Sequence, residues 1–280
     1  MKNLVIYTMI NNEVSNLEEW IEFHRNQGVD GFVVYDHNST DNSLGVLKKY
    51  PESLVKVIPL PIKEPHAARI SMAKSTMKMT KGTCNFCAFI DVDEYLFNPD
   101  KKSTALQMIT NLFDRYPDAG GIGVNWLTFG TMCRTLGQEL NLNSKSIVKN
   151  CLFRSDKTHG VNHHIKTIFR PHAITEKYTD PHGFHYKPGF RCIDTNGSTI
   201  EGPFNRRPDF PTDRLRLHHY FISSINFFIK EKLDRISFIH KDKPFPDVLE
   251  EQARLMRELR VTKDVTAVDF AGTYTRNGDS

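Results

Sequence analysis

The chain has 280 residues, of which 39% are hydrophobic and 25% are charged, as in ordinary globular proteins with a substantial core. Its net charge of +4 at pH 7 is spread over pairs such as Lys48-Lys49 and Lys101-Lys102 rather than gathered in blocks. This weak, scattered charge argues against nucleic-acid binding, whereas it suits phosphate-bearing ligands or an anionic membrane surface.

The N-terminal residues predict neither a secretory signal nor a membrane span. The apolar stretch within residues 1–10 is too short for a signal peptide, and no run approaches the roughly 20 apolar residues that cross a bilayer. The five cysteines of such a chain are expected to be reduced thiols. We therefore expect a cytoplasmic protein, with peripheral contact at the inner membrane face as an option.

Residues 1–90 alternate between segments of strand and helix character. Apolar runs of strand length are followed by segments with helical periodicity, as where Leu17, Trp20 and Ile21 share a face. The strands are expected at 4–7, 31–35, 54–60 and 86–90, and the helices at 17–27, about 41–50 and 65–81. This alternation predicts an α/β fold with a mostly parallel central sheet flanked by helices.

Polar clusters follow three of these strands, at residues 11–13, 36–41 and 91–94. The carboxyl ends of parallel strands meet at one edge of the sheet, and ligands of such folds bind beyond that edge. We therefore expect the three clusters to converge on one binding site.

After residue 95 the alternation weakens. A helix is expected at 104–115 and a strand at 120–126, followed by a stretch rich in loops, prolines and histidines. Helices are expected again from Leu217 to about His240 and from Phe245 to Arg260. We assign residues 1–215 to the main domain and residues 216–280 to a C-terminal helical extension packed on it.

The acidic turn Asp91-Val92-Asp93-Glu94 directly follows an apolar strand. Carboxylates at i and i+2 of an extended chain point to the same side, so Asp91 and Asp93 are expected to face one ligand. One or two carboxylates suffice to hold Mg²⁺ or Mn²⁺, whose other positions take phosphate oxygens and water. Such an ion would act as a Lewis acid toward a departing diphosphate. The alternative is a solvated turn or a helix cap.

Three further patterns have plainer interpretations. Cys84 and Cys87 have the spacing of a zinc or redox pair, but without a second ligand pair we interpret them as core thiols. The histidines between 159 and 219 show no zinc motif, so one of them as a metal ligand is favoured over a three-histidine zinc site. Arg206-Arg207 is interpreted as an exposed loop, with a mobile lid over a diphosphate as the alternative.

A set of short motifs runs through the chain in order. Its members are Asn12-Glu13, Leu17-Glu18-Glu19-Trp20-Ile21, His24, Tyr35-Asp36, Ser39-Thr40-Asp41, the stretch 89–96, Trp126, Phe129-Gly130, the stretch 166–171 and His219-Tyr220. Together, over roughly residues 3–232, they resemble glycosyltransferases of the family 2 and family 92 types. The resemblance implies a GT-A fold for residues 1–215, a nucleotide-diphosphate sugar donor, and Mn²⁺ or Mg²⁺ as cofactor.

The resemblance also implies roles for residues on the donor side. Asn12, Glu13 and Asp36 would line the base and ribose of the nucleotide. Arg69, in the helix before the acidic strand, would approach the diphosphate. Asp91 would hold the ribose or the metal ion.

The remaining implied roles concern the metal and the acceptor. Asp93 would be the main metal ligand and His219 the late histidine that joins it, with His182 and His218 as alternatives. Glu94 would support the metal ligands or touch the donor sugar, and we count it with the catalytic candidates. Trp126 and Gly130 would form the acceptor-side loop.

A general base is harder to place. Many inverting relatives carry a carboxylate after the acceptor loop, whereas residues 146–151 of this chain contain none. Asp156 and Asp180, which lie further along the chain, are the candidates, with Glu176 behind them. A base must lie within hydrogen-bond reach of the attacking hydroxyl, and the sequence does not report that distance, so we do not choose between them. Because the base is not identified, the sequence also leaves open whether the reaction inverts or retains the configuration of the anomeric carbon.

We therefore predict a metal-dependent glycosyltransferase that moves a sugar, with UDP favoured as the carrier, to a saccharide or lipid-linked acceptor in cell-surface polysaccharide synthesis. One alternative is a nucleotidyltransferase that makes activated sugars, although the Gly-rich phosphate loop typical of that class is absent after the first strand. A second alternative is a non-catalytic module that binds sugars or nucleotides. A phosphatase with Asp91 as nucleophile is the weakest.

Overall fold

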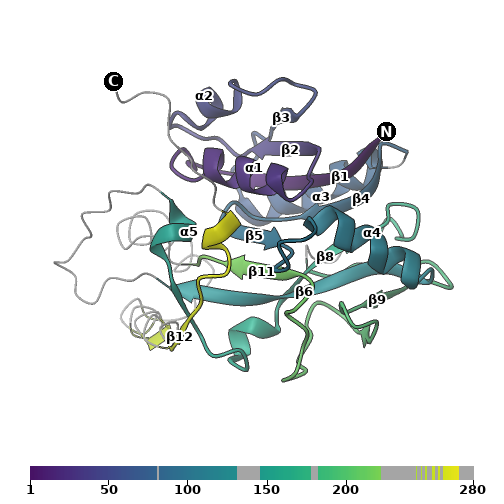
Figure 1. Cartoon of the computed structure of the whole chain (residues 1–280). Helices are drawn as coiled ribbons and strands as arrows, with labels where there is room; N and C mark the ends of the chain where they lie inside the picture. The colour runs from purple at the N-terminus through teal and green to yellow at the C-terminus, as the bar shows by residue number, and fades with distance from the viewer. Residues whose placement is uncertain are drawn as a thin grey trace.

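The computed structural model describes residues 1–80, 82–130, 146–177, 182–221, 244, 247, 250, 254–255, 258 and 261–270. Within these ranges the strands join in one sheet, with the order β10-β9-β6-β8-β4-β1-β2-β3 along its main path (Figure 1). The path places β1, β4 and β8 in the interior of the sheet, so the chain segments that follow β1 and β4 emerge from its centre.

The first half of the chain forms four parallel strands with helices between them. The strands are β1 (Lys2–Ile10), β2 (Gly31–Asp36), β3 (Val55–Pro59) and β4 (Cys84–Phe89), and β1 pairs with β2 and β4 while β2 pairs with β3. The helices are α1 (Leu17–Asn26), α2 (Ser43–Leu47) and α3 (Pro65–Met79). The alternation predicted for this half is confirmed.

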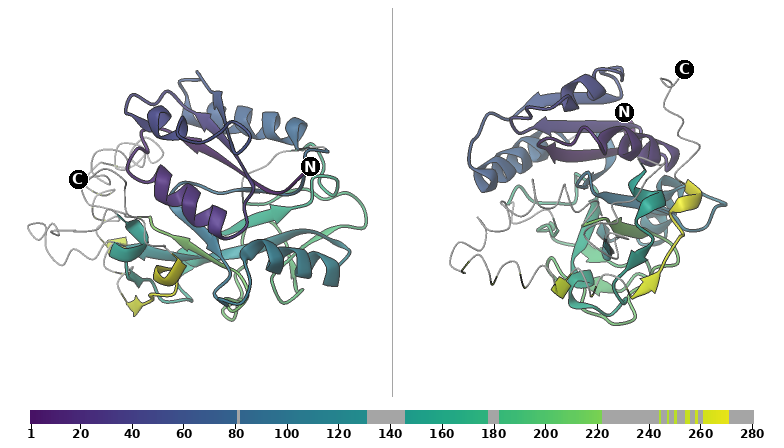
Figure 2. Two further views of the ribbon diagram at one scale, coloured as in Figure 1. Left: turned by 45° about the horizontal axis from the view of Figure 1, so that its top comes forward. Right: turned by 90° about the vertical axis from the view of Figure 1, so that its left-hand side faces the viewer.

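These parallel strands are covered on both faces. Leu4 and Ile6 of β1 pack in the core that contains Trp20 of α1, whereas Val5 and Tyr7 pack in the core that contains Met72 of α3. Successive side chains of a strand point to opposite faces, so a strand buried on both sides becomes a continuous apolar run. Figure 2 shows the same layering in two further views.

The second half of the chain adds a mixed sheet. Its strands are β5 (Glu94–Phe97), β6 (Ala119–Gly130), β7 (Phe153–Arg154), β8 (Ile165–Phe169), β9 (Arg191–Ile193), β10 (Thr199–Ile200), β11 (Arg216–His219) and β12 (Thr262–Lys263). Between them lie α4 (Ala105–Arg115), α5 (Ile147–Asn150) and the short 3₁₀ helices Gly160–His163 and Val268–Phe270. β8 runs antiparallel between β4 and β6, while β6 is parallel to β9 and β11. The sheet is thus parallel over its first four strands and mixed beyond them.

The helix predicted from Leu217 is wrong at its start. Residues Arg216–His219 form β11, which pairs parallel to β6 and antiparallel to β5. Its partner strands lie far away in sequence, so a local pattern cannot reveal the pairing. β11 therefore belongs to the sheet of the main domain although it lies beyond residue 215. Of the rest of the predicted helix, Tyr220 and Phe221 are not helical, and residues 222–240 lie outside the described residues.

The last described stretch closes against the second half of the sheet. β12 pairs with β7, and the Nε atom of Arg154 lies 2.9 Å from the Asp264 carboxylate. Of the helix predicted at 245–260, residues 247, 250, 254, 255 and 258 are described, and all five are helical. No helix in the described ranges is both long and apolar enough to cross a membrane.

Candidate functional site

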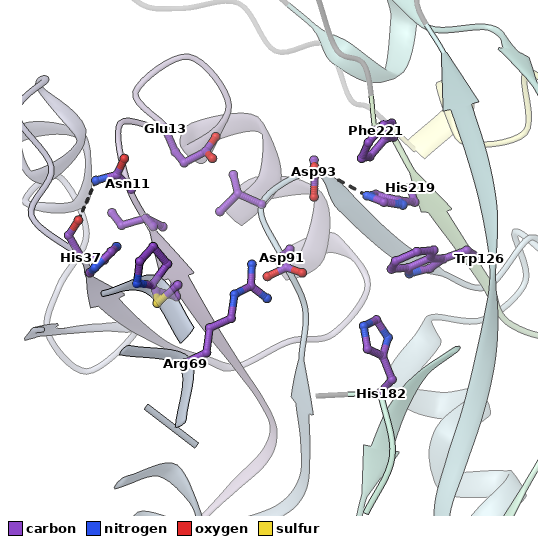
Figure 3. A pocket seen from close by; sticks show the side chains of 14 residues that line it. Asn11, Glu13, His37, Arg69, Asp91, Asp93, Trp126, His182, His219 and Phe221 are labelled. Carbon is purple, nitrogen blue, oxygen red and sulfur yellow. Dashed lines mark hydrogen bonds and ion pairs between the residues drawn. The ribbon is translucent and has the colours of Figure 1, made fainter. Parts of the chain in front are cut away.

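The polar clusters predicted to converge do border one cavity. Its volume is about 410 Å³, within the range of small-molecule sites, and it opens beyond the carboxyl ends of β1 and β2 (Figure 3). Its walls come from both halves of the chain. The lining residues are Met9, Ile10, Asn11, Glu13, His37, Pro65, Arg69, Asp91, Val92, Asp93, Trp126, His182, His219 and Phe221.

One side of the cavity is built by the loops after β1 and β2. The Asn11 side chain donates to the His37 carbonyl at 2.6 Å, which ties the two loops together. Asn12 does not line the cavity. With a φ of 60°, it turns its side-chain oxygen to accept the backbone N–H groups of Thr40 and Asp41 at 2.8 and 3.1 Å. Asn12 therefore supports the loops on this side of the cavity without lining it.

Glu13 and Arg69 both line the cavity wall. In Figure 3 the guanidinium of Arg69 points from α3 toward Asp91. Asp36, by contrast, is not a lining residue. Its carboxylate accepts the Ser39 N–H at 3.3 Å, so its visible role is to hold the loop after β2.

The acidic turn forms the floor of the cavity, where Asp91 and Asp93 are both lining residues. The turn is fixed from two directions. The Trp20 indole donates to the Glu94 carbonyl at 2.8 Å, and the Tyr220 N–H donates to the Asp93 carbonyl at 2.8 Å. Because α1 and the end of β11 both hold it, the turn presents its carboxylates in fixed positions.

Glu94 is not a lining residue, which favours the first of its two implied roles, support of the metal ligands, over contact with the donor sugar. Its side chain is fully buried, and one carboxylate oxygen accepts the Asp91 N–H at 2.9 Å. Burial raises the pKa of Glu94 to about 8, although the nearby Lys166 ammonium acts in the opposite direction. Glu94 is therefore a support for the turn.

Lys166 of β8 was missed as a site residue. Its ammonium lies 2.8 Å from Asp91 Oδ2 and 3.2 Å from Glu94 Oε2, and its side chain is only 2% exposed. Burial acts to raise the pKa of Asp91, but Lys166 and then Arg69 outweigh it and hold that pKa well below its usual value. The signal available in the sequence was a lysine inside the strand-like run 165–169, which contains no other charged residue.

Asp93 and His219 approach each other across the cavity floor. The Nε2 atom of His219 lies 3.6 Å from Asp93 Oδ2, and both side chains are largely buried (Figure 3). His219 sits opposite Glu94 in the pairing of β11 with β5, which explains why it reaches the acidic turn. A carboxylate and an imidazole so close together form a donor set that suits Mn²⁺. Among the described residues, no group of three or more His, Cys, Asp or Glu side chains is placed to hold a metal ion.

Aromatic rings form the wall opposite Arg69. The Trp126 ring lies 4.2 Å from that of His219 and 4.7 Å, stacked, from that of His164. The Nδ1 atom of His182 donates to the Ile165 carbonyl at 2.7 Å, and burial, followed by Lys166, lowers the pKa of His182 to about 3. This wall thus presents aromatic rings to the cavity, together with the neutral imidazole of His182.

The remaining predicted residues lie elsewhere. Asp156 is exposed and accepts from Thr158, so the structure does not bring it to the cavity. Gly130 pairs with Phe153 at the end of β6, away from the lining residues. Glu176 is exposed, and Asp180 lies outside the described residues.

The basic loop and the cysteine pair also lie outside the cavity lining. The Arg206 guanidinium lies over the Phe204 ring, 5.2 Å from its centroid, and Arg207 lies 3.4 Å from the Asp194 carboxylate. Both arginines are exposed, which agrees with the plainer interpretation of this loop. Cys84 and Cys87 are buried thiols whose sulfur atoms lie 2.9 Å apart.

Comparison with known proteins shows that this chain matches one protein family. The model of glycosyltransferase family 92 matches residues 7–187. Among curated relatives, a family 92 protein of Ricinus communis is 24% identical over 198 residues, which cover 69% of this chain and 33% of the relative. A family 92 protein of Oryza sativa subsp. japonica is 25% identical over 195 residues, covering 69% and 31%. The chain thus spans about a third of the length of these relatives.

Solved structures give weaker likenesses. The TarS fragment 1–349 of S. aureus in complex with UDP is 19% identical with a TM-score of 0.37, covering 63% of this chain and 51% of that one. Glucosyl-3-phosphoglycerate synthase of Mycobacterium tuberculosis, in complex with Mn²⁺, UDP and its product, is 16% identical with a TM-score of 0.31, covering 45% and 44%. The family assignment comes from the family model and the curated relatives.

Proposed function

The chain belongs to glycosyltransferase family 92, and from this premise we propose that it transfers a sugar from a nucleoside-diphosphate donor to a hydroxyl of a saccharide or lipid-linked acceptor. The GT-A fold expected for this family agrees with the observed α/β sheet, whose four parallel strands lead into the acidic turn. The observation that carries the proposal is the convergence of Asp91, Asp93, Arg69 and His219 on one cavity.

The cavity has the two sides that such a donor requires. The loops after β1 and β2 bring Asn11, Glu13 and His37 to one end, where polar groups suit a base and a ribose. Arg69 stands between that end and the acidic turn, so its guanidinium is placed to pair with a diphosphate. The aromatic wall at the other end gives the sugar an apolar surface. We favour UDP as the nucleotide.

Mn²⁺ or Mg²⁺ is the proposed cofactor, held by Asp93 and His219 with Asp91 beside them. When bound, such an ion supplies positive charge to a leaving diphosphate. Asp93 offers a hard oxygen and His219 a ring nitrogen on the same side of the cavity floor. These magnesium-type sites commonly take few protein ligands and complete their coordination with phosphate oxygens and water.

The proposed reaction is a displacement at the anomeric carbon of the donor sugar. A bond forms from the acceptor hydroxyl oxygen to that carbon, and the bond from the carbon to the diphosphate oxygen breaks. Arg69 pairs with the departing diphosphate, and the hydroxyl proton passes to a base. Asp156 is not a lining residue of the cavity, and no residue of the described cavity wall is assigned as the base.

The test is transfer, or slow donor hydrolysis, measured with UDP-sugars and Mn²⁺. Wild type should release UDP, and Asp93→Asn should reduce the rate by about 100-fold or more because it removes a charged group that faces the transition state. Asp114→Asn, an exposed change on α4, is the matched control and should keep the wild-type rate. Full activity of Asp93→Asn would rule out the proposed role of the acidic turn.

The same assay separates the alternatives. A nucleotidyltransferase would form a UDP-sugar from a sugar phosphate and UTP, with release of pyrophosphate instead of UDP. A binding module would hold the donor without releasing UDP from it. Either result with a well-folded wild-type protein would replace the proposed function.

A further inference from the structure

Lys166 is a buried cation directly beneath the proposed donor site. β8 places it antiparallel between β4 and β6, and its register partner on β6 is Val124. Burying an ammonium group is costly unless a carboxylate pairs with it, and here Asp91 does so at 2.8 Å, with Glu94 Oε2 at 3.2 Å as a second contact. These contacts tie the buried cation to the acidic turn.

The ammonium fixes the direction of Asp91. Lys166 engages Oδ2 of that carboxylate, while the Asp91 side chain remains 38% exposed and lines the cavity. Lys166 thereby holds Oδ2 toward β8, and Oδ1 is the oxygen that it does not engage. Asp93, in contrast, shows its contact with His219 on the cavity side.

Lys166 also offsets the negative charge of the turn. A divalent cation near Asp91 would feel the repulsion of a fixed ammonium within a few ångströms, in surroundings of low polarity where charges act strongly on one another. A nucleoside diphosphate brings additional negative charge to the same place. The cation would therefore gain far more from binding when the diphosphate is present.

We propose that Lys166 is the resident counter-ion of the acidic turn, which orients Asp91 and keeps the affinity for a free divalent cation low, so that the cation is taken up together with the nucleoside diphosphate. This inference rests on the proposed function. It assigns Lys166 a positioning role, because the ammonium acts through Asp91 and the local charge.

The test measures Mn²⁺ binding, by electron paramagnetic resonance of the free ion, with and without saturating UDP. In wild type, UDP should tighten Mn²⁺ binding by about tenfold or more. Lys166→Gln, which retains a donor for Asp91 but has no charge, should bind Mn²⁺ alone about tenfold more tightly than wild type and respond less to UDP. Lys166→Arg should behave like wild type, and Lys74→Gln, an exposed change on α3, is the control.

The measurement on wild type alone can overturn the inference, so the test remains decisive even if a variant does not fold. If wild type binds Mn²⁺ equally well with and without UDP, the inference is wrong whatever the variants do. If Lys166→Gln binds UDP and shows wild-type affinity for Mn²⁺ alone, the inference also fails while the proposed function survives. If folded wild type binds no nucleoside diphosphate in the presence of Mn²⁺, the proposed function falls and this inference falls with it.

Discussion

The attachment of α1 to β5 makes folding sensitive to acid through His24. This residue is fully buried, its Nδ1 atom donates to the Trp20 carbonyl at 2.8 Å, and its Nε2 atom accepts the Leu96 N–H at 3.1 Å. Protonation would place a second donor against that N–H. Burial accordingly lowers the pKa of His24 from 6.5 to about 4, despite its hydrogen bond to Trp20.

The sign and size of the effect follow from that shift. Since the unfolded chain binds this proton more readily than the folded chain, the free energy of unfolding falls as the pH drops below 6.5, and the loss is complete below pH 4. A shift of this size corresponds to about 3 kcal/mol in full, of which about 2 kcal/mol is lost between pH 7 and pH 5.

The perturbation that isolates this contribution is His24→Phe. Phenylalanine keeps the ring contacts with Trp20 and Tyr95 but leaves the Leu96 N–H without its acceptor, so stability at pH 7 should fall by about 1–3 kcal/mol. The acid dependence should shrink at the same time. Urea unfolding at pH 7 and pH 5 should show a decrease smaller in the variant by about 2 kcal/mol. Equal decreases in wild type and variant would refute the reasoning, since other titrating groups are common to both.

Two further changes test the fold and the donor side. Gly28 ends α1 with a φ of 92°, and a Cβ atom there would lie 2.7 Å from Cβ of Leu106, so Gly28→Ala should lower the free energy of unfolding by about 1–3 kcal/mol. Gly82→Ala, at a φ of 74° in open space, is the control for backbone strain alone and should cost less; equal losses in chemical denaturation would contradict the crowding argument. Arg69→Gln should raise the KM for the donor about tenfold, because it removes a charged partner of the diphosphate. Lys74→Gln is the control and should leave the KM unchanged. An unaltered KM in Arg69→Gln would exclude this contact.

The sequence predicted the first half of the fold because that half follows a simple rule. Strands buried on both faces, such as β1 and β4, are continuous apolar runs, and the helices between them have clear periodicity and end signals. Gly28, for example, follows α1 with a positive φ, as glycines at helix ends commonly do, and its N–H donates to the Arg25 carbonyl at 2.9 Å. Local pattern and tertiary structure agree there.

The second half depends on partners that are distant in sequence. β11 is four residues long and its residues were read as the start of a helix, because its pairing with β5 and β6 leaves no local trace. Part of the site was nevertheless predictable. Asp91, Asp93, Arg69 and His219 were expected at one place because strand ends converge or because the family motif implied it, and the structure brings all four to one cavity.

The sequence did not reveal the direction of every side chain. Glu94 differs from Asp93 by one position, yet it turns inward, and only the structure shows that Lys166 reaches both it and Asp91 from β8. The base candidate Asp156 likewise lies at an exposed place outside the cavity lining, where its carboxylate accepts from Thr158. Acidic character alone does not reveal which carboxylates share a cavity.

The central claim is that the acidic turn binds a nucleoside diphosphate together with a divalent cation. The most direct measurement is the melting temperature of the protein with UDP, with Mn²⁺, and with both, because a ligand that binds the native state raises it by mass action. UDP with Mn²⁺ should raise the melting temperature of wild type more than the separate effects combined, and should leave Asp93→Asn nearly unchanged. An equal rise in Asp93→Asn, or no response of wild type to any nucleoside diphosphate, would contradict the claim.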